Sequence, residues 1–266
     1  PRPTVPAETR ADKWAKTGIV SMRGEGVVDV PRAVWGVGLA ARILDLGGNR
    51  IAQVPAEIAR LRGLQRLRLS GNGLTGAGVA WDAVFELDQL TVLALDHNAI
   101  DKVPDAIGRL QQLKNLDLSH NRLSAVPGAA LGSLSCLVLL GLAGNQLLAA
   151  PPELAGCSAL EQLDLSENQI AEVPAAWGGL KCLQAILLDS NRVAAVPAEV
   201  LKGCSALNTL SLHSNPITIE KLREMDGFKE YDARRKGKFD KQFDMGVMIE
   251  RGGFDEGADN SQWRHW

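Results

Sequence analysis

Residues 113–127 read LKNLDLSHNRLSAVP, and this stretch sets the pattern for most of the chain. Apolar residues occupy its first, fourth, sixth and eleventh places (Leu113, Leu116, Leu118 and Leu123), and Asn121 holds the ninth. The arrangement returns around seven further asparagines, with successive intervals of 23, 26, 23, 24, 23, 23 and 24 residues. The full series is Asn49, Asn72, Asn98, Asn121, Asn145, Asn168, Asn191 and Asn215.

A repeat of this pattern, with a period of about 20 to 29 residues, is typical of leucine-rich-repeat solenoids. The fourth and sixth residues of the template point to the same side of a strand, so both leucines face the inside of the coil. The Asn carboxamide can satisfy backbone groups where the chain leaves the strand. One turn cannot bury its own leucines, so the turns must stack. The sequence predicts an α/β leucine-rich-repeat solenoid, a right-handed horseshoe with a parallel sheet on its concave face.

The repeat divides the chain into four segments. Residues 1–13 are rich in proline and charge and are predicted to be a linker. Residues 14–217 form about nine turns, of which the first is degenerate because Glu25 replaces the asparagine. Residues 218–230 are predicted to be a helical C-terminal cap, and residues 231–266 an aromatic, charged tail.

The predicted cap and tail rest on apolar residues outside the repeats. Ile219, Leu222 and Met225 recur at three-residue spacing, which gives a short helix one apolar side that can cover the open end of the core. In the tail, aromatic residues have the side-chain types of interface anchors. We expect three of them to dock in a groove of the repeats or of a partner: Phe254, Trp263 and Trp266.

Composition excludes several classes of partner. The net charge is −2 and no apolar run approaches the roughly 20 residues of a membrane span. We therefore expect a protein partner and neither nucleic acid, a small-molecule substrate nor a cofactor. The chain begins with Pro1 rather than Met, so peripheral membrane attachment through a preceding segment stays open.

Four cysteines precede strand leucines, at Cys136, Cys157, Cys182 and Cys204, and are predicted to fill a buried packing position. No cysteine pair has zinc-ligand spacing, so no metal site is expected. Neither end carries a cysteine cluster, and no Asn-x-Ser/Thr acceptor occurs. These features predict an intracellular protein, in the cytoplasm or, if a leader precedes Pro1, in an organelle.

The second full repeat is irregular. After Leu74 it runs TGAGVAWDAVFELDQL, with three extra residues and no Val-Pro. Trp81, Val84 and Phe85 have helical spacing, so a longer convex helix is expected there.

Two patterns imitate functional motifs. Gly71, Gly73 and Gly76 form G-x-G-x-x-G after a strand, but Asn72 within it belongs to the repeat and no β-α-β unit surrounds it. A Ser-His-Asp-like set lies just past two strands, and an open curved sheet offers it neither pocket nor oxyanion hole. This set comprises Asp96, His97, Asp117, Ser119 and His120. A solvated polar edge is the better interpretation, and no catalytic residues are predicted.

The third and fifth template places alternate with the buried leucines and therefore line the concave face, where such solenoids usually bind. From the third to the seventh full repeat, apolar and polar strips alternate across this face. That alternation suits a peptide or protein surface, although sequence drift at exposed positions would also produce it. The predicted partner-binding residues are Arg66, Arg68, Val92, Ala94, Asn115, Asp117, Leu139, Gln162, Asp164 and Leu187.

The repeats resemble the 23-residue class of small intracellular leucine-rich-repeat proteins of eukaryotes. The segment ITIEKLREMDGFKEYDARRKGKFDKQ (residues 217–242) resembles the tail of a subfamily found in animals and plants. Some plant members of that subfamily carry a ubiquitin-like domain ahead of the repeats. The resemblance implies an adaptor or scaffold without catalytic residues.

These observations favour a non-catalytic protein–protein interaction module, a signalling adaptor or scaffold. One alternative is a structural subunit held in a larger assembly through its tail. Another is the binding part of an enzyme or ubiquitin-pathway factor whose active domain lies upstream of Pro1.

Overall fold

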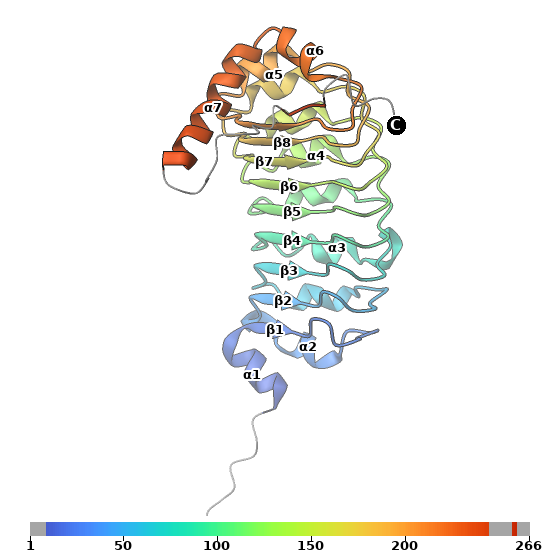
Figure 1. Cartoon of the computed structure of the whole chain (residues 1–266). Coiled ribbons are helices and arrows are strands. Elements are labelled where there is room, and N and C mark those ends of the chain that lie inside the picture. Colours follow the sequence, from blue (N-terminus) through green and yellow to red (C-terminus); the bar gives the residue numbers. More distant parts are fainter. Residues whose placement is uncertain (1–8, 245–256, 260–266) are drawn as a thin grey trace, which may run out of the picture.

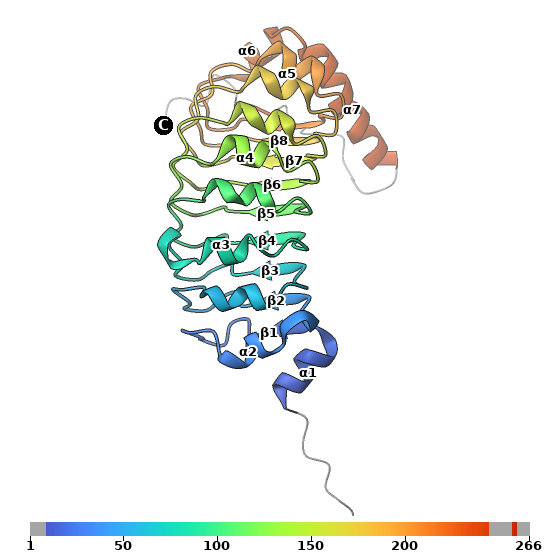
Figure 2. The same cartoon turned by 180° about the vertical axis from the view of Figure 1, so that it is seen from behind.

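The computed structural model describes residues 9–244 and 257–259, which wind into one solenoid with its strands on one side and its helical segments on the other (Figures 1 and 2). Nine strands of three residues stack in chain order into a single parallel sheet, as the repeat predicts. The strands are β1 (Ile19–Ser21), β2 (Ile43–Asp45), β3 (Arg66–Arg68), β4 (Val92–Ala94), β5 (Asn115–Asp117), β6 (Leu139–Gly141), β7 (Gln162–Asp164), β8 (Ala185–Leu187) and β9 (Thr209–Ser211).

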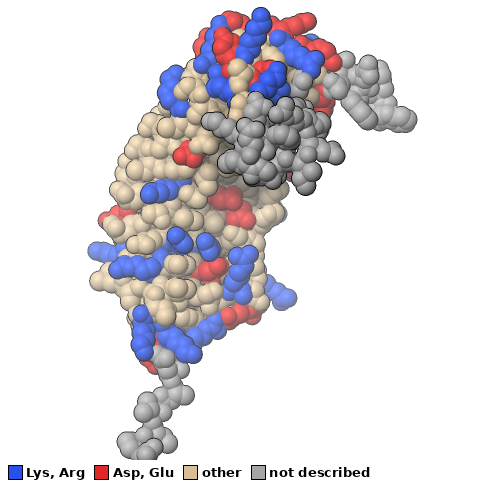
Figure 3. Space-filling view, turned by 60° about the vertical axis from the view of Figure 1, so that its left-hand side comes forward, with Lys and Arg blue, Asp and Glu red and all other residues tan. Residues whose placement is uncertain are grey.

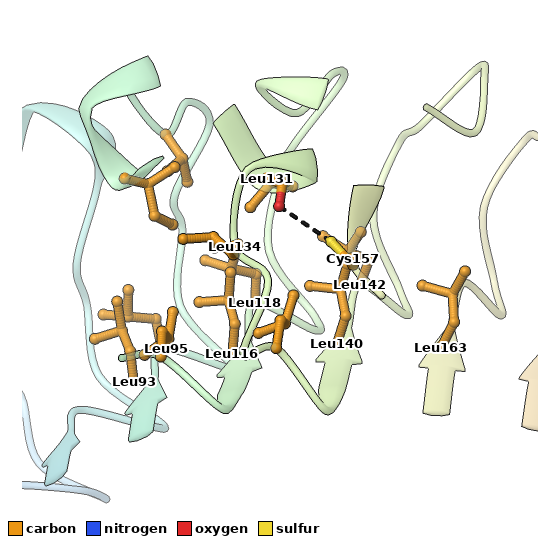
Figure 4. Packing of buried hydrophobic residues seen from close by; sticks show 14 of the residues in the cluster. Leu93, Leu95, Leu116, Leu118, Leu131, Leu134, Leu140, Leu142, Cys157 and Leu163 are labelled. Atoms are coloured by element: carbon orange, nitrogen blue, oxygen red, sulfur yellow. Dashed lines mark hydrogen bonds between the residues drawn. The ribbon is translucent and has the colours of Figure 1, made fainter. Parts of the chain in front are cut away.

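The strands are paired so that equivalent template places lie side by side. Leu93, Leu116, Leu140 and Leu163 hold the fourth place in four successive turns and are partners across the ladder. Their side chains point into the coil and are at most 1% exposed (Figure 4). Each leucine therefore packs against the turns before and after it, which is why the array must fold as a unit.

The convex side consists of short helical segments, most of which begin after a proline. Proline suits this place because its fixed φ favours the turn and no backbone donor is needed there. Between β1 and β9 these segments are α2 (Arg32–Gly36), η1 (Gly38–Ala40), η2 (Ala56–Arg60), η3 (Gly76–Gly78), α3 (Trp81–Val84), η4 (Asp105–Arg109), α4 (Gly128–Gly132), η5 (Pro152–Gly156), η6 (Ala175–Gly179) and α5 (Ala198–Gly203).

The irregular repeat does not contain the longer helix expected from its sequence. Helix α3 spans only Trp81–Val84, and the extra residues form the short turn η3 (Gly76–Gly78). The Trp81 indole N–H donates to the Gly76 carbonyl at 2.8 Å. Val79 forms an isolated parallel bridge with Val54 of the preceding turn. The prediction was wrong because the added residues pair with the neighbouring turn instead of extending the helix.

The N-terminal end is covered by α1 (Arg10–Thr17). Its first turn has a capping box, in which the Thr9 hydroxyl accepts from the Asp12 N–H and the Asp12 carboxylate accepts from the Thr9 N–H. The Trp14 side chain lies against the first turn and is 7% exposed. The helix thus includes residues 10–13, which the sequence had assigned to the linker. The deciding signal is the Thr-x-x-Asp spacing.

The C-terminal end carries two helices, α6 (Ile219–Glu224) and α7 (Phe228–Asp244), where one capping helix over residues 218–230 was expected. Ile219 and Leu222 of α6 are buried against the last turn. Gly227 separates the helices with a φ of +91°, and a Cβ there would lie 3.0 Å from that of Leu201 in α5. The chain therefore turns sharply against α5 and continues as α7 into the predicted tail.

The cysteines do not share one environment. Cys157 and Cys204 are buried and each Sγ donates to a carbonyl of the preceding turn, that of Leu131 or Trp177, at 3.1 Å (Figure 4). Cys136 is half-buried and Cys182 is exposed, so the prediction of four buried cysteines was wrong for this pair. The reason is register: Cys136 and Cys182 stand directly before a first-place leucine, whereas Cys157 and Cys204 stand three residues before one.

Candidate protein-binding face

A shallow hollow of about 310 Å³ lies on the concave face between β4 and β7. It brings together seven of the ten predicted binding residues on four neighbouring strands. Its walls alternate between apolar and polar side chains, as the sequence pattern predicts, and buried leucines form its floor. The seven residues are Val92, Ala94, Asn115, Asp117, Leu139, Gln162 and Asp164.

Gly141 helps to shape this hollow and was not among the predicted binding residues. A Cβ at Gly141 would lie 2.7 Å from Asp117 Oδ1 and 2.9 Å from Ser119 Oγ. The absence of a side chain therefore leaves room for the Asp117 carboxylate beside β6. The sequence signal is a glycine in a face position that carries a larger residue in the other turns.

The two acidic residues of the hollow are held in place by their own turns. Asp117 Oδ1 accepts a hydrogen bond from the Ser119 N–H at 3.0 Å, and Asp164 Oδ1 accepts from the Ser166 N–H at 3.0 Å. Both side chains are half-buried. The Asp-x-Ser spacing therefore fixes one carboxylate oxygen of each residue, so the charge is presented without the entropy cost of ordering a mobile side chain.

Helix α7 stands at the C-terminal end of the concave face. The Lys238 ammonium donates to Thr209 Oγ1 of β9 at 2.8 Å. Lys238 and the predicted binding residue Leu187 line a second cavity of about 340 Å³. Leu187 therefore lies outside the hollow, next to a helix that the repeat pattern could not place. Lys238 belongs to a basic run, RRKGKFDK (residues 234–241), whose position over the sheet the sequence alone does not show.

Arg66 and Arg68 also lie outside the hollow, on the strand that precedes it. Arg66 is exposed and pairs across the ladder with Val92, whereas Arg68 is half-buried and pairs with Ala94. The predicted tail anchors Phe254, Trp263 and Trp266 fall outside the described residues.

Each asparagine of the ladder joins two turns. Asn121 Nδ2 donates to the Leu95 carbonyl at 2.9 Å and to the Leu118 carbonyl at 3.0 Å, and its Oδ1 accepts from the Ile100 N–H at 3.0 Å. The same set of bonds recurs at the other seven asparagines. Because the bonded groups are largely buried, these residues have a structural role and do not form part of a binding surface.

The Ser-His-Asp-like set belongs to a turn. The residue before every ladder asparagine has a positive φ, including His97 at 53° and His120 at 52°. The two imidazole rings stack with centroids 4.3 Å apart. Asp117 bonds to the backbone N–H of Ser119. A Cβ on Gly144, the next residue in this series, would lie 2.3 Å from His120 Nδ1, so glycine gives the stacked ring its space.

The glycine-rich motif also has a structural role. Asn72, within the glycine-rich motif, donates to carbonyls of two turns and so belongs to the ladder. Over residues 9–244 and 257–259, no three His, Cys, Asp or Glu side chains gather as a metal site. No helix in this part of the chain is both long and apolar enough to cross a membrane.

The outer edge of β9 is covered by residues that do not belong to the repeat. The Leu210 N–H donates to the Tyr231 hydroxyl at 3.1 Å. The Leu212 N–H donates to the Gly257 carbonyl at 2.7 Å. The Ser214 N–H donates to Asp259 Oδ2 at 2.6 Å. These three acceptors face the edge of the sheet, where an unpaired strand would otherwise invite association with another chain.

Comparison with known proteins agrees with this architecture. Models of the leucine-rich-repeat family match residues 62–80 and 85–147. A plant intracellular Ras-group-related LRR protein of Oryza sativa subsp. japonica is 44% identical over 258 residues, which cover 97% of this chain and 68% of that protein. The chain belongs to the plant intracellular Ras-group-related LRR proteins.

Two further proteins are similar to parts of the chain. An LRR repeats and ubiquitin-like domain-containing protein of Arabidopsis thaliana is 36% identical over 97 residues, which cover 36% of this Ras-group-related chain and 26% of that protein. An LRR protein of Leptospira interrogans has a similar structure, with a TM-score of 0.65 and 28% identity over 77% of this chain and 56% of its own.

A solved receptor structure is also similar. The plant peptide hormone receptor RGFR1, in complex with RGF2, gives a TM-score of 0.63 and 29% identity over 73% of this chain and 31% of its own. The similarity to this Ras-group-related chain therefore concerns less than a third of the receptor chain.

Proposed function

We propose that this chain is a non-catalytic protein-binding module that holds a segment of another protein in the concave hollow between β4 and β7. The observation that carries the proposal is the hollow itself, in which amides and two carboxylates held by turn hydrogen bonds alternate with apolar residues on a parallel sheet. Apolar contact area gives affinity, and preorganised polar groups give orientation.

The open form of the hollow favours a protein segment over a small molecule. It extends across four strands, and neighbouring strands lie about 4.8 Å apart. The similar receptor RGFR1 is in complex with RGF2. We infer that an adaptor or scaffold role inside the cell, in the cytoplasm, fits these features and the name of the rice relative.

A bulky substitution in the hollow tests this proposal. Ala94 is half-buried in the hollow, whereas Ala149 is exposed beyond the post-strand loop of a later turn. The test is proximity labelling in cells that express the full chain. The partner should be lost from the labelled proteins when the chain carries Ala94→Arg and should still be labelled when it carries Ala149→Arg. Equal recovery of the partner with both variants would exclude the hollow as the binding site.

A charge substitution separates the acidic residues from the shape of the hollow. Replacing Asp117 and Asp164 with Asn keeps an oxygen that can accept the turn hydrogen bond, whereas Lys reverses the charge and removes the acceptor. Binding should weaken in the Asn variant and vanish in the Lys variant. Both variants should melt within a few degrees of the wild type. Undiminished binding by the Lys variant would locate the interaction elsewhere.

A further inference from the structure

Charge changes sign along the solenoid although the chain is nearly neutral. Residues 9–68 carry eleven arginines and lysines against five aspartates and glutamates, whereas residues 69–210 carry seven against fourteen. Figure 3 shows the basic side chains gathered over the N-terminal end, followed by a surface with few charges. This asymmetry makes the N-terminal part of the solenoid net positive.

Two arginines bring this charge onto the concave face itself. Arg66 and Arg68 are the outward residues of β3, directly beside the strand on which the hollow begins. Asp45 of β2 lies nearby with its side chain 12% exposed. Its Oδ2 is 3.8 Å from Arg68 Nη1 and 4.0 Å from Arg23 Nη1. One carboxylate therefore faces two guanidinium groups and cannot neutralise both.

The guanidinium groups on β3 retain donors for an incoming acceptor. The contact from Asp45 to Arg68 is longer than a hydrogen bond, and within the described part of the chain neither Arg66 nor Arg68 donates a side-chain hydrogen bond. A planar guanidinium matches a carboxylate through two parallel hydrogen bonds, which makes such pairs strong and directional.

The positive surface is narrow. Along the ladder Arg68 is followed by Ala94, then Asp117, then Gly141 and Asp164. With about 4.8 Å between strands, the first carboxylate lies about 10 Å beyond Arg68. A nucleic-acid backbone that followed the concave face would run into Asp117 and Asp164, whereas one or two acidic side chains would fit over β3.

We propose that Arg66 and Arg68 form a carboxylate-binding subsite for an extended, acidic segment of a protein partner. The segment places its acidic residues over β3 and its apolar residues in the hollow between β4 and β7. The centre of the hollow lies about two and a half strand spacings from β3, which an extended chain covers in about four residues. The partner motif is thus an acidic pair separated from an apolar pair by about four residues. This inference rests on the proposed function and adds the chemistry of the partner.

Synthetic peptides test the subsite on the full chain. The probe is a fluorescein-labelled peptide with two glutamates, four glycine or serine residues, then leucine and valine, and its match carries glutamines in place of the glutamates. Fluorescence anisotropy should show that the acidic peptide binds at least about tenfold more tightly than its match. Its affinity should fall as NaCl rises from about 50 to 500 mM, because the contacts are between charges.

A control variant with the same change in net charge shows whether the loss of affinity comes from the concave face. R66E/R68E should reduce affinity for the acidic peptide at least about tenfold, and R66Q/R68Q should do so without reversing the charge. The control R60E/R62E makes the same change in net charge at two exposed arginines in and just after η2, on the convex side of the same turn. It should leave affinity within about twofold. Circular dichroism melting shows whether each variant is folded.

Several results would overturn the subsite. Equal binding of the two peptides, or equal losses in R66E/R68E and R60E/R62E, would leave only a general charge effect. Tighter, Arg66-dependent binding of a single-stranded 20-mer oligonucleotide or of phosphatidylserine vesicles would assign the arginines to another ligand. If the acidic peptide fails to bind while Ala94→Arg still removes the cellular partner, the subsite is wrong and the proposed function stands. If Ala94→Arg has no effect while peptide binding depends on Arg66 and Arg68, the proposed hollow is wrong.

Discussion

An interior turn and the last turn of this solenoid have the same sequence pattern but obtain their hydrogen-bond partners differently. In the interior, the Leu165 N–H donates to the Leu187 carbonyl at 2.8 Å and the Glu167 N–H to the Asp189 carbonyl at 2.7 Å, both in the next turn. In the last turn, the equivalent N–H groups belong to Leu212 and Ser214.

In the part of the chain that the structure describes, β9 is the last strand of the sheet, and a separate segment supplies the acceptors that a next turn would provide. The Gly257 carbonyl takes the first bond at 2.7 Å, and the Asp259 carboxylate takes the second at 2.6 Å. Asp259 Oδ1 also lies 2.9 Å from His213 Nδ1. The φ of Gly257 is +91°, and a Cβ there would lie 2.2 Å from the Leu210 carbonyl oxygen, so only glycine allows this approach. An interior turn is therefore completed by repetition, and the last one by specific residues outside the repeat.

Deleting all of the segments that cover the last turn should have the largest effect on solubility and stability. Truncation after Asn215 deletes α6, α7 and residues 257–259 and exposes the leucines of the last turn. We expect an insoluble protein or one without cooperative unfolding, measured by gel filtration and thermal circular dichroism. Truncation after Met245 keeps both helices and should leave a folded, less stable array. Equal solubility and stability of the shorter chain would contradict the capping role of the helices.

Core truncations test whether the two kinds of turn are equally well packed. Leu163→Ala in the interior should cost about 2 to 5 kcal/mol of unfolding free energy, because a fully buried leucine leaves a cavity. Leu116→Ala should cost a similar amount. Leu210→Ala in the last turn should match them if the C-terminal cover packs as closely as a further repeat would.

A surface substitution provides the baseline for the core series. Lys114→Ala should change the unfolding free energy by at most about 0.5 kcal/mol, since this side chain is exposed. Chemical denaturation reports all four variants. A loss at Lys114 as large as that at Leu163 would show that the assigned register is wrong.

The Asp259 carboxylate at the edge of the sheet should contribute less to the unfolding free energy than a buried leucine. Asp259→Ala removes the acceptor of the Ser214 N–H and the partner of His213. Because this site is partly exposed, we expect a loss of about 1 kcal/mol in unfolding free energy. Asp259→Asn keeps an acceptor oxygen and should lose less. Hydrogen exchange of the Ser214 amide should accelerate in the Ala variant, whereas the equivalent Glu167 amide should not change.

Thiol reactivity offers the finest comparison between an interior and a terminal turn. Burial raises the pKa of both Cys157 and Cys204 to about 11, so at neutral pH each thiol is protonated and unreactive. Cys182 is exposed and should react first with an aromatic disulfide reagent.

The order of the two buried thiols then measures local opening. Cys157 lies under further repeats, whereas Cys204 lies in the turn covered by α7. If the C-terminal cover opens more often than an interior turn, Cys204 reacts before Cys157 without global unfolding. Simultaneous reaction, at the rate of global unfolding, would show that the array opens only as a unit.

The sequence by itself determined the array. The spacing of the leucines and asparagines predicted about nine turns with a parallel sheet in this register, because each turn contacts neighbours that share its template. It also predicted which side chains line the concave face, and seven of the ten predicted binding residues line the hollow. It did not show which cysteines are buried, because their burial depends on the template place that they occupy. Template place likewise sets the backbone, since the place before the asparagine has a positive φ whether glycine, histidine, glutamate or serine occupies it.

The sequence predicted a capping helix after the repeats, but only the tertiary structure decided how the edge of the last strand is completed. The contact between His213 and Asp259 joins residues 46 positions apart, and Lys238 reaches Thr209 from a helix outside the repeat. No periodic pattern encodes such contacts. A solenoid repeats one local structure, so its interior can be predicted from the sequence of one turn. A terminal turn has a neighbouring turn on one side only, so its other side does not follow from the repeat. Its exposed edge and core must be satisfied by side chains whose positions depend on the folding of the whole chain.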